Sequence, residues 1–188
     1  MKLSSLLALS FSILFLASCD DEPEDPIIPN EEEVITTLKL TLIDQATNDT
    51  LHFVFQDLSG VGTPPIFSST DTLSPNKTYS GMLELLNEQE TPADTITNEI
   101  EDEAEEHQFF YQTDVSSLSI NYADTDMDGN PIGLASTFVT GPDTNQMGTL
   151  TITLRHEPNK FGQGVSGGDI TNAGGETDIE VNFNIYVE

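Results

Sequence analysis

Cysteine, tryptophan and the basic residues are scarce or missing in this chain. It has a single cysteine, Cys19, no tryptophan, and only five lysines and arginines against 33 aspartates and glutamates. A single cysteine excludes an intrachain disulfide. The formal net charge of −28 argues against nucleic acid as a partner, because phosphate binding needs clustered basic side chains. Divalent cations, basic proteins and neutral glycans stay open as ligands.

The N-terminus has the layout of a secretory signal. Lys2 precedes an apolar run over residues 6–16, and Leu-Ala-Ser-Cys follows at 16–19. The run is too short for a permanent membrane-spanning helix. The pattern resembles the lipobox of bacterial type II signal peptides, which implies cleavage before Cys19 and a lipid on its sulfur. We therefore expect a lipoprotein signal peptide at 1–18 and a membrane as partner through that lipid.

Residues 20–33 combine eight acidic residues with three prolines. Such a segment cannot bury enough apolar surface to fold, so residues 19–33 are predicted to form a lipidated acidic tether. Acids directly after the cysteine also resemble the surface-export signal of Bacteroidota lipoproteins. This resemblance implies the outer membrane, with the protein facing the cell exterior. An anchor that faces the periplasm is the alternative.

Alternation of apolar and polar residues dominates the chain from Val34 onward. Clusters of Gly, Pro, Asn and Asp bound each alternating run and supply turns. Seven or eight short antiparallel strands over residues 34–188 predict one all-β domain, an immunoglobulin-like β-sandwich. The expected strands are 38–42, 51–55, 79–86, 109–112, 118–122, 134–139, 150–154 and 179–187.

Residues 94–108 break this alternation. Ile96, Ile100 and Ala104 recur at helical spacing, and Thr97 is a candidate N-cap. Most other residues of the segment are acidic. We expect one short acidic helix or turn between two strands.

An Asp-rich stretch matches the first half of an EF-hand calcium loop. Gly129 stands at the sixth position, but Ala135 stands at the twelfth, where a bidentate Glu is needed. Two interpretations stay open: an incomplete Ca²⁺ loop with a further ligand from 99–106, or a hairpin turn held by Asx hydrogen bonds. The candidate calcium ligands are Asp124, Asp126, Asp128 and Asn130.

Two histidines and a glutamate form an alternative metal set. His107, His156 and Glu106 could bind zinc or another transition metal if the strands bring them together. The competing interpretation makes the histidines ordinary polar residues at strand ends. In that case Arg155 and Lys160 would neutralise the acids of the predicted helix.

No catalytic residues are assigned. Gly164 to Gly168 fits G-x-S-x-G, but no histidine follows the serine as a hydrolase triad in that order requires. We therefore expect a non-enzymatic binding or accessory module of the cell envelope. The alternatives are a metal-dependent hydrolase that uses His107, His156 and a nearby Glu, and a structural envelope protein.

Five segments carry a wider resemblance: 31–38, 105–111, 128–134, 155–160 and 175–179. With these, the chain resembles small flavobacterial or cytophagal (Bacteroidota) lipoproteins of unassigned function. Some of those are labelled "type 1 periplasmic binding fold superfamily protein", a two-lobed α/β fold that the strand pattern here does not predict. A surface accessory role would include an envelope complex, such as a TonB-dependent receptor, among the partners.

Overall fold

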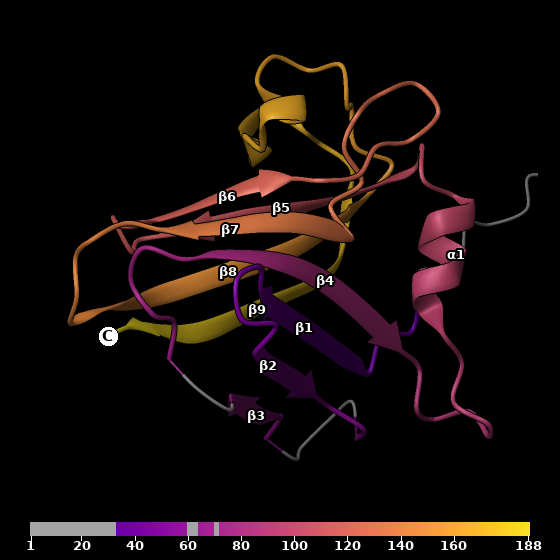
Figure 1. The fold of residues 1–188 in the computed structure, drawn as a ribbon. Coiled ribbons are helices and arrows are strands. Elements are labelled where there is room, and N and C mark those ends of the chain that lie inside the picture. The colour runs from indigo at the N-terminus through magenta and orange to yellow at the C-terminus, as the bar shows by residue number, and fades with distance from the viewer. Residues whose placement is uncertain (1–32, 60–63, 70–71) are drawn as a thin grey trace, which may run out of the picture. The chain divides into compact units, whose positions relative to one another are not determined.

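The computed structural model describes residues 33–59, 64–69 and 72–188 (Figure 1). The predicted signal peptide, Cys19 and all of the predicted tether except Glu33 lie outside the described residues. No helix in these three ranges is both long and apolar enough to cross a bilayer.

Nine strands, one α-helix and two short 3₁₀ helices make up the described residues. The strands are β1 (Thr37–Asp44), β2 (Thr50–Gln56), β3 (Ile66–Ser69), β4 (Thr78–Leu86), β5 (His107–Thr113), β6 (Leu118–Tyr122), β7 (Ala135–Thr140), β8 (Gln146–His156) and β9 (Glu176–Val187). The helices are α1 (Ile96–Asp102), η1 (Val165–Gly167) and η2 (Ile170–Asn172).

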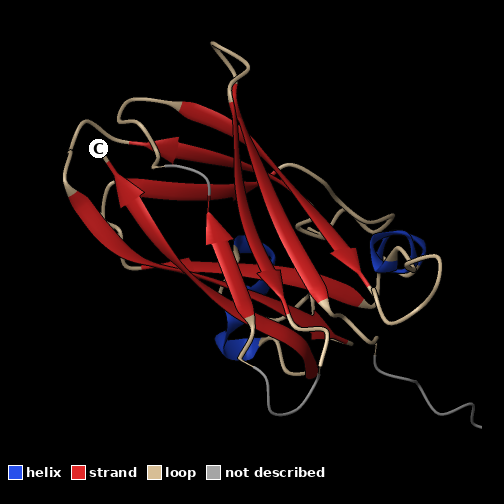
Figure 2. Cartoon of the chain, turned by 90° about the horizontal axis from the view of Figure 1, so that it is seen from below, coloured by secondary structure: helices blue, strands red, loops and turns tan. Residues whose placement is uncertain are grey.

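The strands form two antiparallel sheets that enclose one core (Figures 1 and 2). One sheet has the order β3-β2-β1-β4-β7-β6, and the other has the order β5-β8-β9. Leucines of β1 from the first sheet and of β8 from the second belong to the same buried cluster. The predicted all-β antiparallel sandwich is confirmed, and its immunoglobulin-like class stays a prediction.

Period-2 alternation explains the strands because it puts every second side chain on the core face. In β9 the buried side chains are Ile179, Val181, Phe183, Ile185 and Val187. Each of the eight expected runs overlaps a strand of the structure. The strand that the sequence did not predict is β3, which has four residues, all of them exposed.

The acidic segment forms α1, which lies beside the end of β4 (Figure 1). Ile96 and Ile100 are buried as the helical spacing predicted. Thr97 is not the N-cap, because the helix begins one residue after Thr95. Instead, the Thr97 hydroxyl accepts a hydrogen bond from the Leu85 N–H at 2.8 Å and donates to the Leu85 carbonyl at 3.3 Å. These bonds tie the helix to β4.

Candidate metal centre

The antiparallel pairing of β5 and β8 places two histidines side by side. His107 is directly opposite His156 in the register, and the ring centroids are 4.6 Å apart. His107 lies in phase with Phe109, and His156 with Leu154, so both imidazoles face the sandwich interior. They are 0% and 4% exposed. The structure thus brings together the two histidines of the alternative metal prediction, within one sheet.

A β-bulge adds Asp178 to this pair. Leu154 pairs with Ile179 in β9, but Arg155 pairs with Thr177, so Asp178 is the extra residue at the step. Strict alternation would turn Asp178 outward, next to the inward Ile179. Because a bulge redirects the side chain of the extra residue, the Asp178 carboxylate is fully buried instead. Its Oδ1 lies 3.7 Å from His156 Nδ1.

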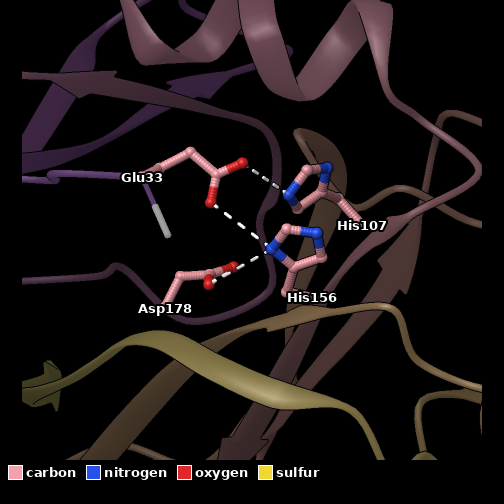
Figure 3. A group of neighbouring side chains, drawn as sticks. All are labelled: Glu33, His107, His156 and Asp178. Carbon is pink, nitrogen blue, oxygen red and sulfur yellow. Dashed lines mark ion pairs between the residues drawn. The ribbon is translucent and has the colours of Figure 1, made fainter. Parts of the chain in front are cut away.

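Glu33 supplies a second carboxylate from the short segment that precedes β1. Its Oε1 lies 2.9 Å from His107 Nε2, and its Oε2 lies 3.7 Å from His156 Nδ1. The Glu33 side chain is only 6% exposed. Figure 3 shows the carboxylates of Glu33 and Asp178 and the rings of both histidines pointing toward one another. We call these four residues the metal centre.

The spacing of the four donor atoms suits one small cation. A tetrahedral zinc ion at about 2.0–2.1 Å from its ligands requires ligand atoms about 3.3 Å apart. Glu33 Oε1 lies 2.9 Å from His107 Nε2, while the other Glu33 oxygen, Oε2, and Asp178 Oδ1 each lie 3.7 Å from His156 Nδ1. One ligand atom from each of the four residues can be chosen so that all four lie within 4.8 Å of one another. Glu33 Oε2 and His107 Nε2 are buried and make no hydrogen bond to the described residues. Donor atoms that converge without hydrogen-bond alignment are typical of a ligand cage.

The outer side of each imidazole also has a partner. His107 Nδ1 lies 3.1 Å from the backbone carbonyl of Glu103. Because a carbonyl only accepts, this contact places a proton on Nδ1, so a metal in the centre would be met by the Nε2 side of the ring. Glu106 is 54% exposed and lies 3.9 Å from the outward nitrogen of His156, Nε2. Glu106 thus lies outside the group formed by Glu33, His107, His156 and Asp178, but with His156 and Glu157 it forms a second group that could hold a metal ion, so Glu106 as a ligand stays a prediction.

Opposing effects act on the pKa values of the closest pair. Burial by itself raises the pKa of the Glu33 carboxyl, but pairing with His107 outweighs burial, so this pKa lies below its usual range. Burial lowers the pKa of the His107 imidazole, but the Glu33 carboxylate outweighs it and holds that pKa above its usual value. Without a metal, the pair therefore favours imidazolium beside carboxylate.

The predicted calcium ligands lie elsewhere, in the β6–β7 connection. Asp124 accepts hydrogen bonds from the Gly133 and Ala135 N–H groups at 2.8 and 2.7 Å. Asp126 Oδ1 accepts from the N–H groups of Asp128 and Asn130 at 3.0 and 2.8 Å. These are the local carboxylate-to-backbone bonds of the hairpin-turn interpretation.

A lysine holds the remaining oxygen of this loop. The Lys160 ammonium donates to Asp126 Oδ2 at 2.8 Å and to the Pro131 carbonyl at 3.2 Å. It also donates to the Ala104 carbonyl, just beyond α1. Both charged side chains are at most 3% exposed. The interpretation of the histidines as polar strand-end residues lets Lys160 neutralise acids of the helix, but in the structure Lys160 pairs with Asp126. Calcium in this loop stays a prediction.

No family model, curated protein or solved structure matches this chain. Its function is therefore argued from the chemistry of the metal centre and from the sequence.

Proposed function

We propose that this chain is a lipid-anchored envelope protein whose β-sandwich binds one divalent transition-metal ion, with Zn²⁺ preferred, in a non-catalytic role. The observation that carries the proposal is the convergence of four buried donor atoms. They come from the segment before β1 and from β5, β8 and β9. Segments so far apart in the chain meet at one point inside the sandwich.

The charge of the centre favours a divalent cation. Glu33 and Asp178 bring two carboxylates into a nearly solvent-free space, where an uncompensated charge costs several kcal/mol. Without a metal, a His107 imidazolium would compensate one of these two carboxylates. One divalent ion balances two carboxylates and two neutral imidazoles exactly in charge. The excess of acids in the chain would also raise the local concentration of cations.

The donor set selects the ion and the role. Two imidazole nitrogens with two carboxylate oxygens suit Zn²⁺ and neighbouring transition metals better than Ca²⁺, which prefers six to eight oxygens. Four protein ligands complete a tetrahedron, whereas catalytic zinc sites keep one position for water or substrate. The centre therefore supports a binding or stabilising role in preference to the hydrolase alternative.

The envelope part of the proposal rests on sequence. The run that ends in Cys19 supports lipid anchoring, and the acids after it support an outer-membrane address that faces the exterior. On that basis we propose an accessory module that works beside an envelope complex such as a TonB-dependent receptor. Incorporation of labelled palmitate into wild-type protein, and its loss on Cys19→Ala, would test the anchor.

Metal analysis and a thermal melt test the metal centre. The full chain carrying Cys19→Ser, which removes a competing thiol ligand, is freed of metal with EDTA and titrated with Zn²⁺. We expect one ion per chain. At free Zn²⁺ 100-fold above Kd, binding adds about 2.7 kcal/mol. For a domain of this size that corresponds to a rise in Tm of roughly 5–11 °C.

Matched variants locate the effect. Asp178→Asn and His156→Gln remove one ligand each at similar size, and both should abolish most of the Zn²⁺-dependent rise in Tm. His52→Gln is the control, because this histidine lies on β2, beside the Thr41 hydroxyl at 3.1 Å and outside the metal centre. Substoichiometric Zn²⁺, or an equal loss in the control, would overturn the proposal. A larger shift with Mn²⁺ or Ni²⁺ would overturn the choice of Zn²⁺.

A further inference from the structure

We propose that the metal ion acts as a fastener for residues 33–35, the strap that leads into the sandwich, so that metal loading sets whether this strap is docked or released. This inference rests on the proposed metal centre. It adds a regulated element, the strap, that metal binding alone does not require.

The ligands are divided unequally between the parts of the fold. His107, His156 and Asp178 belong to β5, β8 and β9, which form one continuous sheet. Glu33 belongs to neither sheet and reaches the centre from the irregular segment before β1. Three ligands thus form a fixed base, and the fourth lies on a segment whose position depends on its own contacts.

Thr36 marks the end of the strap. Its N–H donates to the Leu86 carbonyl at 3.0 Å, and its carbonyl accepts from the Asp57 N–H at 2.8 Å. Its hydroxyl accepts from the Glu88 N–H at 2.8 Å. These bonds fix Thr36 to the six-stranded sheet and do not involve the metal centre. Residues 33–35 can therefore detach while Thr36 and β1 stay in place.

The strap itself has few holding contacts. Val34 is 52% exposed, and Ile35 is partly buried against the core. The Glu33 carboxylate joins the strap to the three-stranded sheet through ion pairs with His107 and His156. Ordering three residues opposes docking through lost conformational entropy. With a metal held by the three other ligands, a bond from Glu33 to the metal would outweigh that entropy loss. Without a metal, the ion pairs between Glu33 and the histidines would hold the strap less firmly.

Hydrogen exchange measures the docking directly. The full chain with Cys19→Ser is followed by mass spectrometry in EDTA and in Zn²⁺, using peptides that cover 33–37, the end of β8 and β6. With free Zn²⁺ 100-fold above Kd, the open population would fall about 100-fold if Zn²⁺ bound only the docked state, and less because the three ligands of the base also bind Zn²⁺. We expect exchange at 34 and 35 to slow by up to that factor, with β6 unchanged. Cleavage after Glu33 by a Glu-specific protease should slow in parallel.

Glu33→Gln separates the strap from the metal centre. This variant keeps three ligands, so Zn²⁺ should still slow exchange at the end of β8, at higher metal concentration. It should no longer slow exchange at 34 and 35. Glu106→Gln, on the outer side of His156, is the matched control and should behave as the wild type.

Three outcomes would overturn the fastener. Zn²⁺ bound at one ion per chain without slower exchange at 34 and 35 would refute it and leave the metal centre intact. Equal slowing at these residues in wild type and Glu33→Gln would do the same. A chain that binds no Zn²⁺ would refute both the proposed function and the fastener. If Glu33→Gln does not fold, cleavage of the wild type after Glu33 replaces it as the test. Equal cleavage rates in Zn²⁺ and in EDTA would refute the fastener.

Discussion

Replacing Lys160 with methionine tests whether an internal ammonium occupies the cation position of the Asp-rich loop. Methionine keeps an unbranched apolar stem, one atom shorter than that of lysine, but removes the charge and all three donors. The substitution leaves the Asp126 carboxylate in place at 1% side-chain exposure. It also removes the ammonium from the carbonyls of Ala104 and Pro131.

The magnitude follows from this burial. Removing one partner of a buried ion pair costs about 3–5 kcal/mol, because the other charge stays desolvated and uncompensated. Asp126 Oδ1 keeps its two N–H donors, which places the expected loss near the lower end, about 3 kcal/mol. That is a large part of the total stability of roughly 5–15 kcal/mol for a domain.

Urea denaturation followed by far-UV circular dichroism measures this loss, provided that the m value, the dependence of the free energy of unfolding on urea, is the same for both proteins. Lys39→Met is the matched control, because Lys39 pairs with Glu84 on the surface, where both side chains are more than a third exposed. We expect the control to lose less than about 1 kcal/mol. A loss in Lys160→Met as small as in the control would refute the reasoning.

Calcium provides the second readout of the same variant. In Lys160→Met three oxygens, from Asp126, Ala104 and Pro131, face a position without an ammonium. Ca²⁺, which binds carboxylate and carbonyl oxygens, should then restore part of the lost stability in the variant and have a smaller effect on the wild type. Equal stabilisation of both proteins by Ca²⁺ would show that the lysine does not fill a cation position.

Three further predictions concern the pH response, two backbone glycines and the core. In EDTA the His107 contribution should be complete below about pH 6.5 and lost as pH rises through its raised folded pKa. The Glu33 contribution should be complete above about pH 4.5 and lost as pH falls through its lowered folded pKa. Stabilisation by Zn²⁺ should instead grow from pH 6 to 8, because Zn²⁺ binds neutral imidazole. Urea titrations give the free energy of unfolding against pH, and parallel curves in EDTA and in Zn²⁺ would contradict the metal centre. Gly175→Ala should destabilise the fold by roughly 3 kcal/mol, because φ is +69° and a Cβ would lie 2.1 Å from the His156 carbonyl oxygen. Gly174 has a φ of +62° but open space around a Cβ, so Gly174→Ala should cost about 1 kcal/mol. Equal effects of the two alanines on the urea midpoint would contradict that contact. Phe138→Ala should cost about 3–5 kcal/mol, because this ring is fully buried and packs edge-on against Tyr111, and a loss below 2 kcal/mol would contradict its core position.

Most of the sandwich could be predicted from the sequence because its strands bury one face and expose the other. Alternation in β1 and β9 is nearly complete, so each side chain's face follows from its position. β3 could not be predicted in this way, because none of its four side chains is buried. Pairing with β2 defines it as a strand, and pairing is a property of the assembled sheet.

Half of the metal centre could be predicted, and the rest depends on tertiary structure. The two histidines are recognisable as metal-ligating residue types near strand ends. Asp178 follows the outward phase of β9 in sequence, and only the bulge opposite Leu154 and Arg155 turns it inward. Glu33 ends an acidic run with the composition of a solvated tether. Nothing in that run distinguishes this glutamate from its neighbours, since its burial comes from the position of the strap.

The shortage of bases connects the two buried polar clusters of the fold. The structure describes four of the five lysines and arginines, and all four are engaged away from the metal centre: Lys39 with Glu84, Lys77 with Asp44, Arg155 with Thr177 and Lys160 with Asp126. Asp126 is therefore buried beside a lysine, while Glu33 and Asp178 are buried beside the imidazoles of His107 and His156. A buried carboxylate needs a compensating charge. In a chain with 33 acids and five bases, a divalent ion would supply that charge where no described lysine or arginine pairs with the carboxylates. A lysine introduced at the metal centre should therefore weaken Zn²⁺ binding.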